Sequence, residues 1–324
     1  MRRGALIGFG EVAQHGHLPA YEKSSEAKIV AIVDSTGERR NIARAFFPEI
    51  ATFAAIEELA AGAELDFVDI CTPPSLHAEG ILEGLRHRWH VLCEKPLLLD
   101  EDELDEVRAK AKQAQRAVVP VHNWKYAPIV RRATALLRSG AIGRLRTVEF
   151  ETLRIQDCAV ADPAHPNWRR NPAIAGGGIL MDHGWHAIYL AQHWFGEAPA
   201  DVRAVLDRSA PDEVENEARL TLLFPSGEAK IFLTWKASRR RSAMRLIGER
   251  GEIAIDDDRL QIGSESIQFA AALSSGSHHG EWFAAMLPDI LATFRQPARW
   301  PKTLAEAALC LSVIQRAYRA DPER

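Results

Sequence analysis

The feature that most constrains the fold is a glycine-rich motif at the end of the first apolar segment. The chain from Gly4 to Gly10 is short and apolar, and the motif reads Gly8-Phe9-Gly10-Glu11-Val12-Ala13. This G-x-G-x-x-A spacing is typical of the turn between a strand and a helix in domains that bind dinucleotides. Gly8 allows a tight turn, Gly10 lets a pyrophosphate approach the main chain, and Ala13 lets the helix pack closely on the strand.

A second strand and an acid complete this pattern. The β-rich run Lys28–Val33 stops at Asp34, a little over twenty residues past the glycines, and an acid there is expected to hold the adenosine ribose hydroxyls. The alternative is that Asp34 only starts a turn or caps a helix that begins near Thr36. A carboxylate disfavours a 2′-phosphate, so we expect NAD; Arg39 and Arg40 lie just beyond and could offset this effect, which leaves NADP possible.

Alternating strands and helices continue to about residue 122. Strands are predicted over 66–71, 90–93 and 117–121, and helices over 76–88 and 101–115. Strands separated by helices indicate βαβ crossovers and a parallel, doubly wound Rossmann sheet. Ligands of such sheets bind at the carboxyl ends of the strands, so the residues that follow each strand are the candidates for a site.

Two short motifs stand at these strand ends. Thr72-Pro73-Pro74 forms a stiff turn followed by His77, and its main chain could lie against a flat ring; the alternative is a Ser75 N-cap and a surface histidine. Glu94-Lys95-Pro96 follows the next strand. A residue before proline avoids the helical region, so Lys95 is expected to be extended and to point into the cleft.

These motifs, in this order and spacing, resemble the glucose–fructose oxidoreductase/inositol dehydrogenase/MocA-type (Gfo/Idh/MocA) family. The resemblance implies an NAD(P)-binding first domain over residues 1–122. The implied cofactor-binding residues are Gly8, Phe9, Gly10, Glu11, Val12, Ala13, Asp34, Thr72, Pro73, Pro74, His77, Glu94 and Lys95.

The second half of the chain has a different pattern. A helix is predicted over 128–138, followed by β-rich runs over 145–155, 201–206, 218–224, 229–235 and 244–247. Consecutive strands favour a mostly antiparallel open sheet, so residues 123–324 are expected to form an α+β domain for substrate binding and oligomerisation. An open sheet with one uncovered face predicts a homodimer or homotetramer.

One segment interrupts these strands and carries candidate chemical groups. Gly176-Gly177-Gly178 is interpreted as a flexible entry to a helix on which Asp182 and His186 share one face. Three hypotheses remain from spacing alone: a structural pair, an acid/base pair, or a metal site that includes His183. His183 is expected to point to a different side and no further ligand is obvious, so no metal is expected.

The resemblance extends to this segment, because Gly-Gly-Gly-Ile-Leu-x-Asp-x-Gly-x-His is similar to the family's second-domain signature. It implies that Lys95, Asp182 and His186 are catalytic, and that Lys125, Trp168, Arg169 and His183 contact substrate. Two departures concern the substrate. Lys125 stands where members often carry arginine, and Tyr189 stands where many sugar-active members carry an acid.

The expected reaction is hydride transfer between nicotinamide and a secondary alcohol or ketone of a sugar, a cyclitol or a related polyol bound between the domains. His186 would accept the hydroxyl proton, Lys95 would stabilise the alkoxide, and Asp182 would orient the substrate or the histidine. Two alternatives among similar proteins are an NAD-retaining glycosidase with no net redox change and a non-catalytic cofactor-sensing regulatory protein.

Composition fits a soluble two-domain protein. The 324 residues carry a formal net charge of −4, which argues against nucleic acid as a partner. No apolar stretch is long enough to cross a membrane. The cysteines, Cys71, Cys93, Cys158 and Cys310, are scattered without a CxxC spacing, so they are expected to be reduced and the protein cytoplasmic.

Overall fold

The computed structural model describes residues 1–61, 64–156, 167–210 and 212–321. By packing, the chain divides into two compact units. The first comprises Met1–Asn123 and His278–Ala308, and the second comprises Trp124–Ser277 and Leu309–Arg324. Residues 278–308 pack with the first unit, whereas the division expected from the sequence, 1–122 and 123–324, placed them in the second domain.

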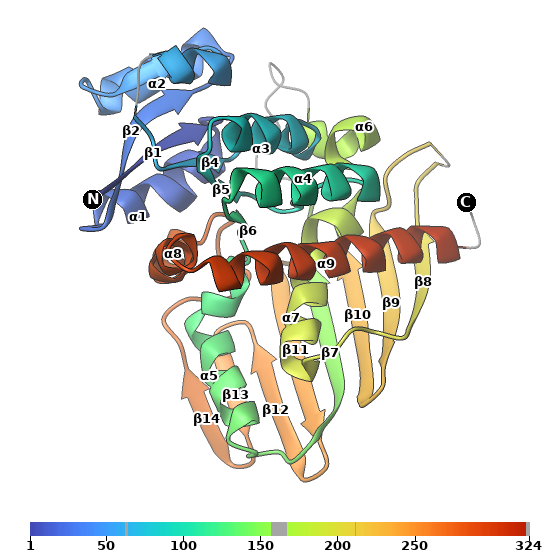
Figure 1. Ribbon diagram of the computed structural model, residues 1–324. Coiled ribbons are helices and arrows are strands. Elements are labelled where there is room, and N and C mark those ends of the chain that lie inside the picture. Colours follow the sequence, from blue (N-terminus) through green and yellow to red (C-terminus); the bar gives the residue numbers. More distant parts are fainter. Residues whose placement is uncertain (62–63, 157–166, 211, 322–324) are drawn as a thin grey trace. The chain divides into compact units, whose positions relative to one another are not determined.

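The first unit is built on a parallel sheet of six strands in the order β3-β2-β1-β4-β5-β6 (Figure 1). The strands are β1 (Arg2–Ile7), β2 (Ala27–Val33), β3 (Ala51–Phe53), β4 (Phe67–Ile70), β5 (His90–Cys93) and β6 (Val118–Pro120). The helices of its first 123 residues are α1 (Leu18–Glu22), α2 (Gly37–Phe46), α3 (His77–Arg86) and α4 (Glu101–Ala114). This is the doubly wound Rossmann arrangement that the sequence predicts, with β3 as a strand that the sequence analysis did not foresee.

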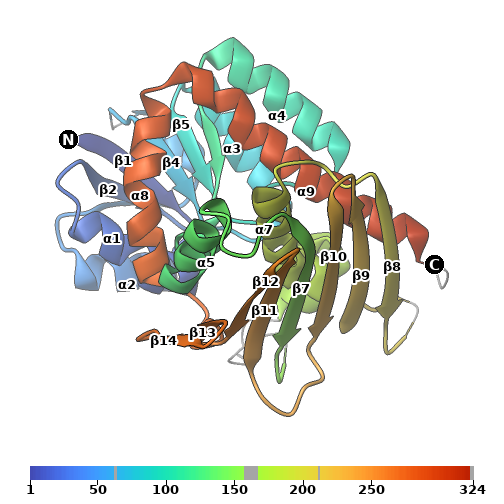
Figure 2. The same cartoon turned by 90° about the horizontal axis from the view of Figure 1, so that it is seen from below.

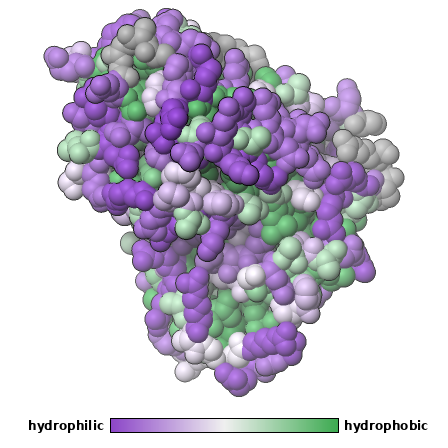
Figure 3. Space-filling view, viewed as in Figure 1, coloured by the Kyte–Doolittle hydropathy of each residue, from purple (hydrophilic) through white to green (hydrophobic). Residues whose placement is uncertain are grey.

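The central strands are apolar because helices cover both faces of a parallel sheet. All four residues of β4 and of β5 are buried. Helix α4, in contrast to these apolar strands, is rich in charged residues. Its N-cap is Asp100, whose side chain accepts from the Glu103 N–H at 2.8 Å, and the residue that follows the helix, Gln115, is in the left-handed conformation. The region where α3 and α4 lie side by side in Figure 1 is mostly hydrophilic in Figure 3.

Residues 278–308 belong to the first unit because helix α8 (Gly280–Phe294) packs on α1 and on η1 (Val12–His17), a π-helical turn that begins within the glycine motif. The ring of Phe283 stacks on His17 with ring centroids 3.8 Å apart. Gly280 lies so close to η1 that a Cβ there would be 2.8 Å from the carbonyl oxygen of His15. These contacts join residues far apart in sequence, and the βαβ pattern of the sequence does not predict them.

The second unit contains an eight-stranded sheet in the order β14-β13-β12-β11-β7-β10-β9-β8. The strands are β7 (Leu145–Leu153), β8 (Asp201–Asp207), β9 (Glu217–Phe224), β10 (Gly227–Thr234), β11 (Arg241–Gly248), β12 (Gly251–Asp256), β13 (Arg259–Ile262) and β14 (Glu265–Gln268). Only the pairing of β7 with β10 is parallel, as far as the described residues go, so the sheet is mostly antiparallel, as expected. Strands β12 to β14 were not predicted, and β7 ends two residues before the predicted end.

Helix α7 (Trp185–Phe195) packs along β7 and β10, and α5 (Pro128–Arg138) packs near β13 (Figure 2). Helix α7 is apolar on nearly all sides, and Trp185, Ile188 and Tyr189 are fully buried. Strands such as β8 alternate strictly between exposed and buried residues, since one face of the sheet carries polar side chains. Helix α9 (Trp300–Ala320) completes the described chain, in which no helix is long and apolar enough to span a membrane.

Candidate functional site

The glycine motif forms the turn from β1 into η1. Gly8 has φ +88°, and a Cβ there would lie 3.0 Å from the main chain of Cys71, so this position requires glycine. Gly10 is different, because a Cβ built on it meets no atom within 4 Å. The space in front of Gly10 is therefore open, and this fits the close approach of a cofactor phosphate to the main chain.

Gly10→Ala is expected to weaken NADH binding by about tenfold or more, because the added methyl group enters the space that a phosphate would use. The same change should leave the free energy of unfolding unaltered, because no described atom crowds the new Cβ. NADH fluorescence titration and urea denaturation measure the two effects. Unchanged NADH affinity in a folded variant would contradict the assignment of this turn.

Asp34 follows β2 and organises the turn. Its Oδ2 accepts the Phe9 N–H at 2.9 Å, and its Oδ1 accepts the N–H and the hydroxyl of Thr36 at 2.9 and 2.8 Å. Asp34 thus starts a turn, as the alternative hypothesis held, and also ties β2 to the glycine motif. Arg39 and Arg40 lie beside it, with Arg39 Nη1 3.6 Å from Oδ2 and Arg40 Nη1 2.6 Å from the Asp34 carbonyl oxygen. The ribose contact stays a prediction.

The Thr72-Pro73-Pro74 turn is held by a buried histidine. The alternative of a surface histidine is wrong, because His77 is fully buried, with Nδ1 2.9 Å from the Pro96 carbonyl oxygen and Nε2 2.9 Å from that of Thr72. Burial lowers the pKa of His77, so the neutral ring donates from one nitrogen at a time. The suggested Ser75 cap is also absent, since neither η3 (Pro74–Leu76) nor α3 has a side-chain cap. The buried Thr72 Oγ1 has no hydrogen-bond partner within the described chain.

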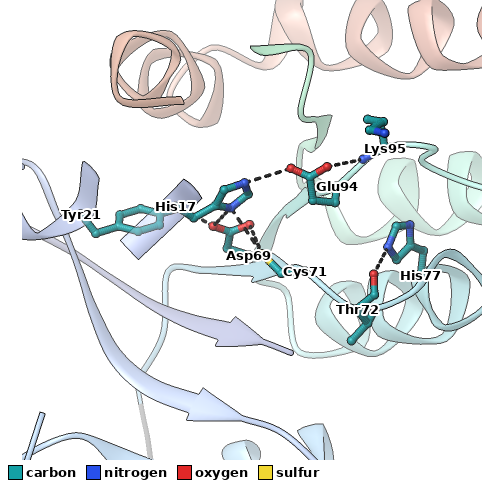
Figure 4. A network of polar contacts seen from close by, with 8 residues as sticks. All are labelled: His17, Tyr21, Asp69, Cys71, Thr72, His77, Glu94 and Lys95. Atoms are coloured by element: carbon teal, nitrogen blue, oxygen red, sulfur yellow. Dashed lines mark hydrogen bonds and ion pairs between the residues drawn. The ribbon is translucent and has the colours of Figure 1, made fainter. Parts of the chain in front are cut away.

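Glu94 and Lys95 follow β5 (Figure 4). The Glu94 Oε1 lies 3.0 Å from His17 Nε2, and its Oε2 accepts the Lys95 N–H at 3.1 Å. Lys95 is followed by a cis peptide bond to Pro96. The carboxylate that was expected to bind cofactor therefore also holds the main chain of the candidate catalytic lysine.

In the second unit, the triple glycine is a packing requirement and not a flexible entry. A Cβ on Gly177 would overlap the Tyr318 hydroxyl, and one on Gly178 would overlap the carbonyl oxygen of Glu215. The buried Glu215 Oε1 accepts from the N–H groups of Gly178 and Leu180 at 2.9 and 3.0 Å and from the Tyr318 hydroxyl at 3.0 Å. Glu215 thus fixes the start of the segment that carries Asp182 and His186.

Gly178→Ala is expected to lower the free energy of unfolding by about 1–3 kcal/mol, because the new Cβ has no space beside Glu215. Urea denaturation of the variant measures this loss, with the uncrowded Gly10→Ala as the matched control. Equal stability of the two variants would show that the turn can relax.

The segment after the glycines is a π-helical turn, η6 (Leu180–Gly184), that leads into α7. Asp182 Oδ2 lies 3.1 Å from His183 Nδ1 and 3.9 Å from Arg169 Nε. His183 was expected to point to a different side from Asp182, and its ring nonetheless contacts the Asp182 carboxylate. Arg169 also lies over the Trp168 ring at 4.3 Å from its centroid, so Trp168, Arg169, Asp182 and His183 form one chain of contacts.

His186 is buried and oriented by two aromatic side chains. Its Nδ1 lies 2.9 Å from the Tyr189 hydroxyl, and Trp124 stacks on its ring with centroids 4.9 Å apart. Tyr189 also accepts the Trp124 N–H at 3.1 Å, and the Lys125 Nζ lies 5.4 Å from the Tyr189 ring centroid. A small pocket of this unit is lined by Trp124, Phe150, Thr152, His183, His186, Ala187, Leu190 and Met244.

The structure thus brings Asp182, His183 and Arg169 together, and places Lys125 and His186 around Tyr189. Lys95 belongs to the other unit. Nothing in the sequence pattern marks Trp124, Thr152 and Met244 as pocket residues, because two of them lie on strands of ordinary pattern. The sequence marks Tyr189 only as a departure from the usual acid. That departure was the available signal that the histidine here has a phenolic partner.

Comparisons with known proteins agree with this architecture. Residues 2–122 match the family model described as "Oxidoreductase family, NAD-binding Rossmann fold", and residues 130–254 match the "GFO/IDH/MocA C-terminal domain". The open space at Gly10, the orphaned Thr72 hydroxyl and Asp34 at the end of β2 fit NAD in the first unit.

Individual relatives include sugar dehydrogenases. The levoglucosan dehydrogenase of Pseudarthrobacter phenanthrenivorans is 35% identical over 46% of this chain and 37% of its own length. The D-apiose dehydrogenase of Paraburkholderia graminis is 27% identical over 80% of this chain and 69% of its own. Oxidoreductase P35 of Formosa agariphila is 29% identical, and the match spans 60% of its length.

Among solved structures, the aldose-aldose oxidoreductase of Caulobacter crescentus, complexed with glycerol, superposes with a TM-score of 0.82. It is 27% identical, and the match covers 98% of this chain and 97% of that one. Both units are therefore accounted for by a single known architecture. The chain belongs to the GFO/IDH/MocA oxidoreductase family, and its first unit is an NAD-binding Rossmann domain.

Proposed function

We propose that this protein is an NAD-dependent dehydrogenase or reductase that acts on a secondary alcohol or ketone of a sugar, a cyclitol or a related polyol. The observation that carries the proposal is His186, an imidazole held by Tyr189 and Trp124 in the wall of a pocket. Membership of an oxidoreductase family and the relatives that act on levoglucosan and D-apiose support the substrate class.

His186 is the proposed acid/base. An ordinary imidazole has a pKa near neutrality and can accept a hydroxyl proton during oxidation and return it during reduction. In this proposal Nδ1 faces the Tyr189 hydroxyl and Nε2 is the atom that exchanges the proton. When Nε2 gains the proton, the Nδ1–H can donate to the Tyr189 oxygen and so disperse the positive charge.

Lys95 is the proposed donor to the alcohol oxygen. Its ammonium group would stabilise the negative charge that develops on that oxygen as the proton leaves. Asp182 keeps its proposed role in orienting substrate, together with Arg169 and His183, with which it is in contact. Trp168 and Lys125 remain proposed substrate contacts.

NAD, when bound, supplies the hydride acceptor for oxidation or the hydride donor for reduction. Gly8 to Ala13 would hold its pyrophosphate, and Asp34 the adenosine ribose. Thr72 has a buried hydroxyl to offer, and the stiff Pro73-Pro74 turn beside it would support the cofactor ring. NAD is preferred to NADP in this proposal because Asp34 is negatively charged.

The test is an initial-rate assay of the purified protein with NAD⁺ or NADP⁺ and a panel of sugars, cyclitols, polyols and sugar glycosides. NADH formation with at least one free polyol or sugar supports the proposal. A glycoside that is cleaved while the cofactor stays bound and unchanged in net redox state overturns it in favour of a glycosidase. Binding of NADH without turnover of any substrate overturns it in favour of a sensor.

A further inference from the structure

A buried polar network in the first unit reaches from the glycine-rich turn to Lys95 (Figure 4). Its centre is His17 in η1, which is 1% exposed. Its Nδ1 lies 2.8 Å from Asp69 Oδ2, on β4, and its Nε2 lies 3.0 Å from Glu94 Oε1, just after β5. Both ring nitrogens therefore meet carboxylates that belong to different strands.

The surroundings of His17 favour its charged form. Burial lowers the pKa of His17, but the charges and hydrogen bonds of Asp69 and Cys71 together outweigh it, so the pKa is raised well above the ordinary value. Burial raises the pKa of Glu94, but the contacts with His17 and Lys95 together outweigh it, so the pKa is lowered. The other neighbours are the Cys71 thiol, whose pKa burial raises to about 12, the Tyr21 hydroxyl and the Phe283 ring.

This charge state bears on what the cluster can bind. His17, Asp69 and Cys71 are close enough to surround a metal ion, with ligand atoms within 4.8 Å of one another. An imidazolium that donates from both nitrogens has no lone pair for a metal, and the neutral thiol is a weak ligand. The geometry is instead that of a cation clamped between two acids.

Glu94 connects His17 to the candidate catalytic lysine. One oxygen of Glu94 is bound by His17, and the other accepts the Lys95 main-chain N–H at 3.1 Å. A glutamate free to rotate could not hold that N–H in one place, because its carboxylate would sample several rotamers. With one oxygen fixed, the second oxygen fixes the backbone from which the Lys95 side chain extends.

The location of His17 connects this device to the cofactor turn. It is the last residue of η1, the π-helical turn that starts directly after Glu11 of the glycine motif. A π-helical turn is uncommon and is frequent at functional sites. Here it ends with His17, whose ring contacts Asp69 on β4 and Glu94 after β5. The segment that would bind phosphate therefore also carries the side chain that orients the Glu94 carboxylate.

We propose that His17 is a positioning residue of the reaction, which acts on Lys95 through Glu94; this inference rests on the proposed dehydrogenase function. His17 touches neither substrate nor cofactor in this proposal. Its effect must therefore appear in the chemical step, must depend on the presence of Lys95, and must exceed what loss of packing alone produces.

The test compares His17→Gln, which can serve only one of the two carboxylates well, with Phe283→Leu, which removes the stacked ring and keeps both contacts. We expect His17→Gln to lower kcat by about tenfold or more, with KM and the NADH dissociation constant within about threefold of wild type. Phe283→Leu should keep kcat within about twofold. Equal losses of kcat in the two variants would reduce His17 to a packing residue and overturn the proposal.

A double mutant identifies the route of the effect. In a Lys95→Met background, adding His17→Gln should cause no further loss of kcat, because residues that act as a unit are not additive. A full additional tenfold loss would overturn the link to Lys95. If His17→Gln does not fold, Glu94→Gln replaces it in the same cycle, since it weakens the contact with His17 from the other side.

A measurement without cofactor or turnover completes the test. Reductive methylation with ¹³C-formaldehyde gives Lys95 an NMR signal, assigned by its loss in Lys95→Met. His17→Gln should shift this signal and Phe283→Leu should not; an unshifted signal in His17→Gln overturns the proposal. If the wild-type protein turns over no substrate, the proposed function fails and this inference falls with it. If the wild type is active and His17→Gln matches it, only the inference fails.

Discussion

His186→Gln is expected to lower kcat by about a hundredfold or more, because a positioned acid/base contributes about 10²–10⁴ to the rate and glutamine cannot accept the substrate proton. NADH affinity should stay unchanged, since the expected cofactor residues lie in the other unit. Steady-state kinetics in both directions, together with NADH titration, measure the two quantities.

The matched control is His193→Gln on the same helix. His193 Nε2 lies 3.3 Å from an Arg138 guanidinium nitrogen and does not line the pocket with His186. The control should retain kcat within about twofold of wild type. Comparable losses in both variants would mean that α7 is merely sensitive to substitution, and the assignment of His186 as the acid/base would be wrong.

Lys95→Met is expected to lower kcat by about 10²–10³, because it removes the donor that stabilises the developing negative charge while keeping a side chain of similar length. The hydrogen bond from the Lys95 main-chain N–H to the Glu94 carboxylate does not involve the ammonium group, so the backbone conformation should be unchanged. The expected signature is a large loss in kcat with a small change in the melting temperature.

Lys110→Met serves as the control, because Lys110 is an exposed residue on α4 and carries the same charge change. It should leave both kcat and the melting temperature near wild type. Retention of full activity by Lys95→Met would exclude the lysine from the chemical step, and the His17 network would then have no catalytic purpose.

Much of the fold could be predicted, because the local sequence patterns of strands, helices and turns match the way these elements pack. The apolar strands up to residue 121, the G-x-G-x-x-A turn and Asp34 together define a doubly wound sheet, since only glycine fits at Gly8 and strands covered on both faces must be apolar. The change of pattern after residue 122 predicted the second unit. The motifs around Lys95 and His186 also identified the family.

The sequence could not reveal which residues support those motifs. Glu215 and Tyr318 hold the glycine turn before Asp182, and they lie 37 and 140 positions from Gly178 along the chain. His17 belongs to no motif of the sequence, yet its two ring nitrogens face the carboxylates of Asp69 and Glu94. Such contacts arise from long-range packing, which leaves no period or motif in the chain.

The sequence by itself determined the glycine turn and the alternation of strands and helices, and it singled out Lys95, Asp182 and His186 as candidates, because each of these patterns depends on neighbours within a few residues. Tertiary structure decided the surroundings of these groups. In the folded chain His186 contacts the Tyr189 hydroxyl, and Gly177 and Gly178 pack tightly against Tyr318 and Glu215. Residues 278–308 pack with the first unit. The physical reason is that burial, charge state and close packing depend on segments that meet only after the chain has folded.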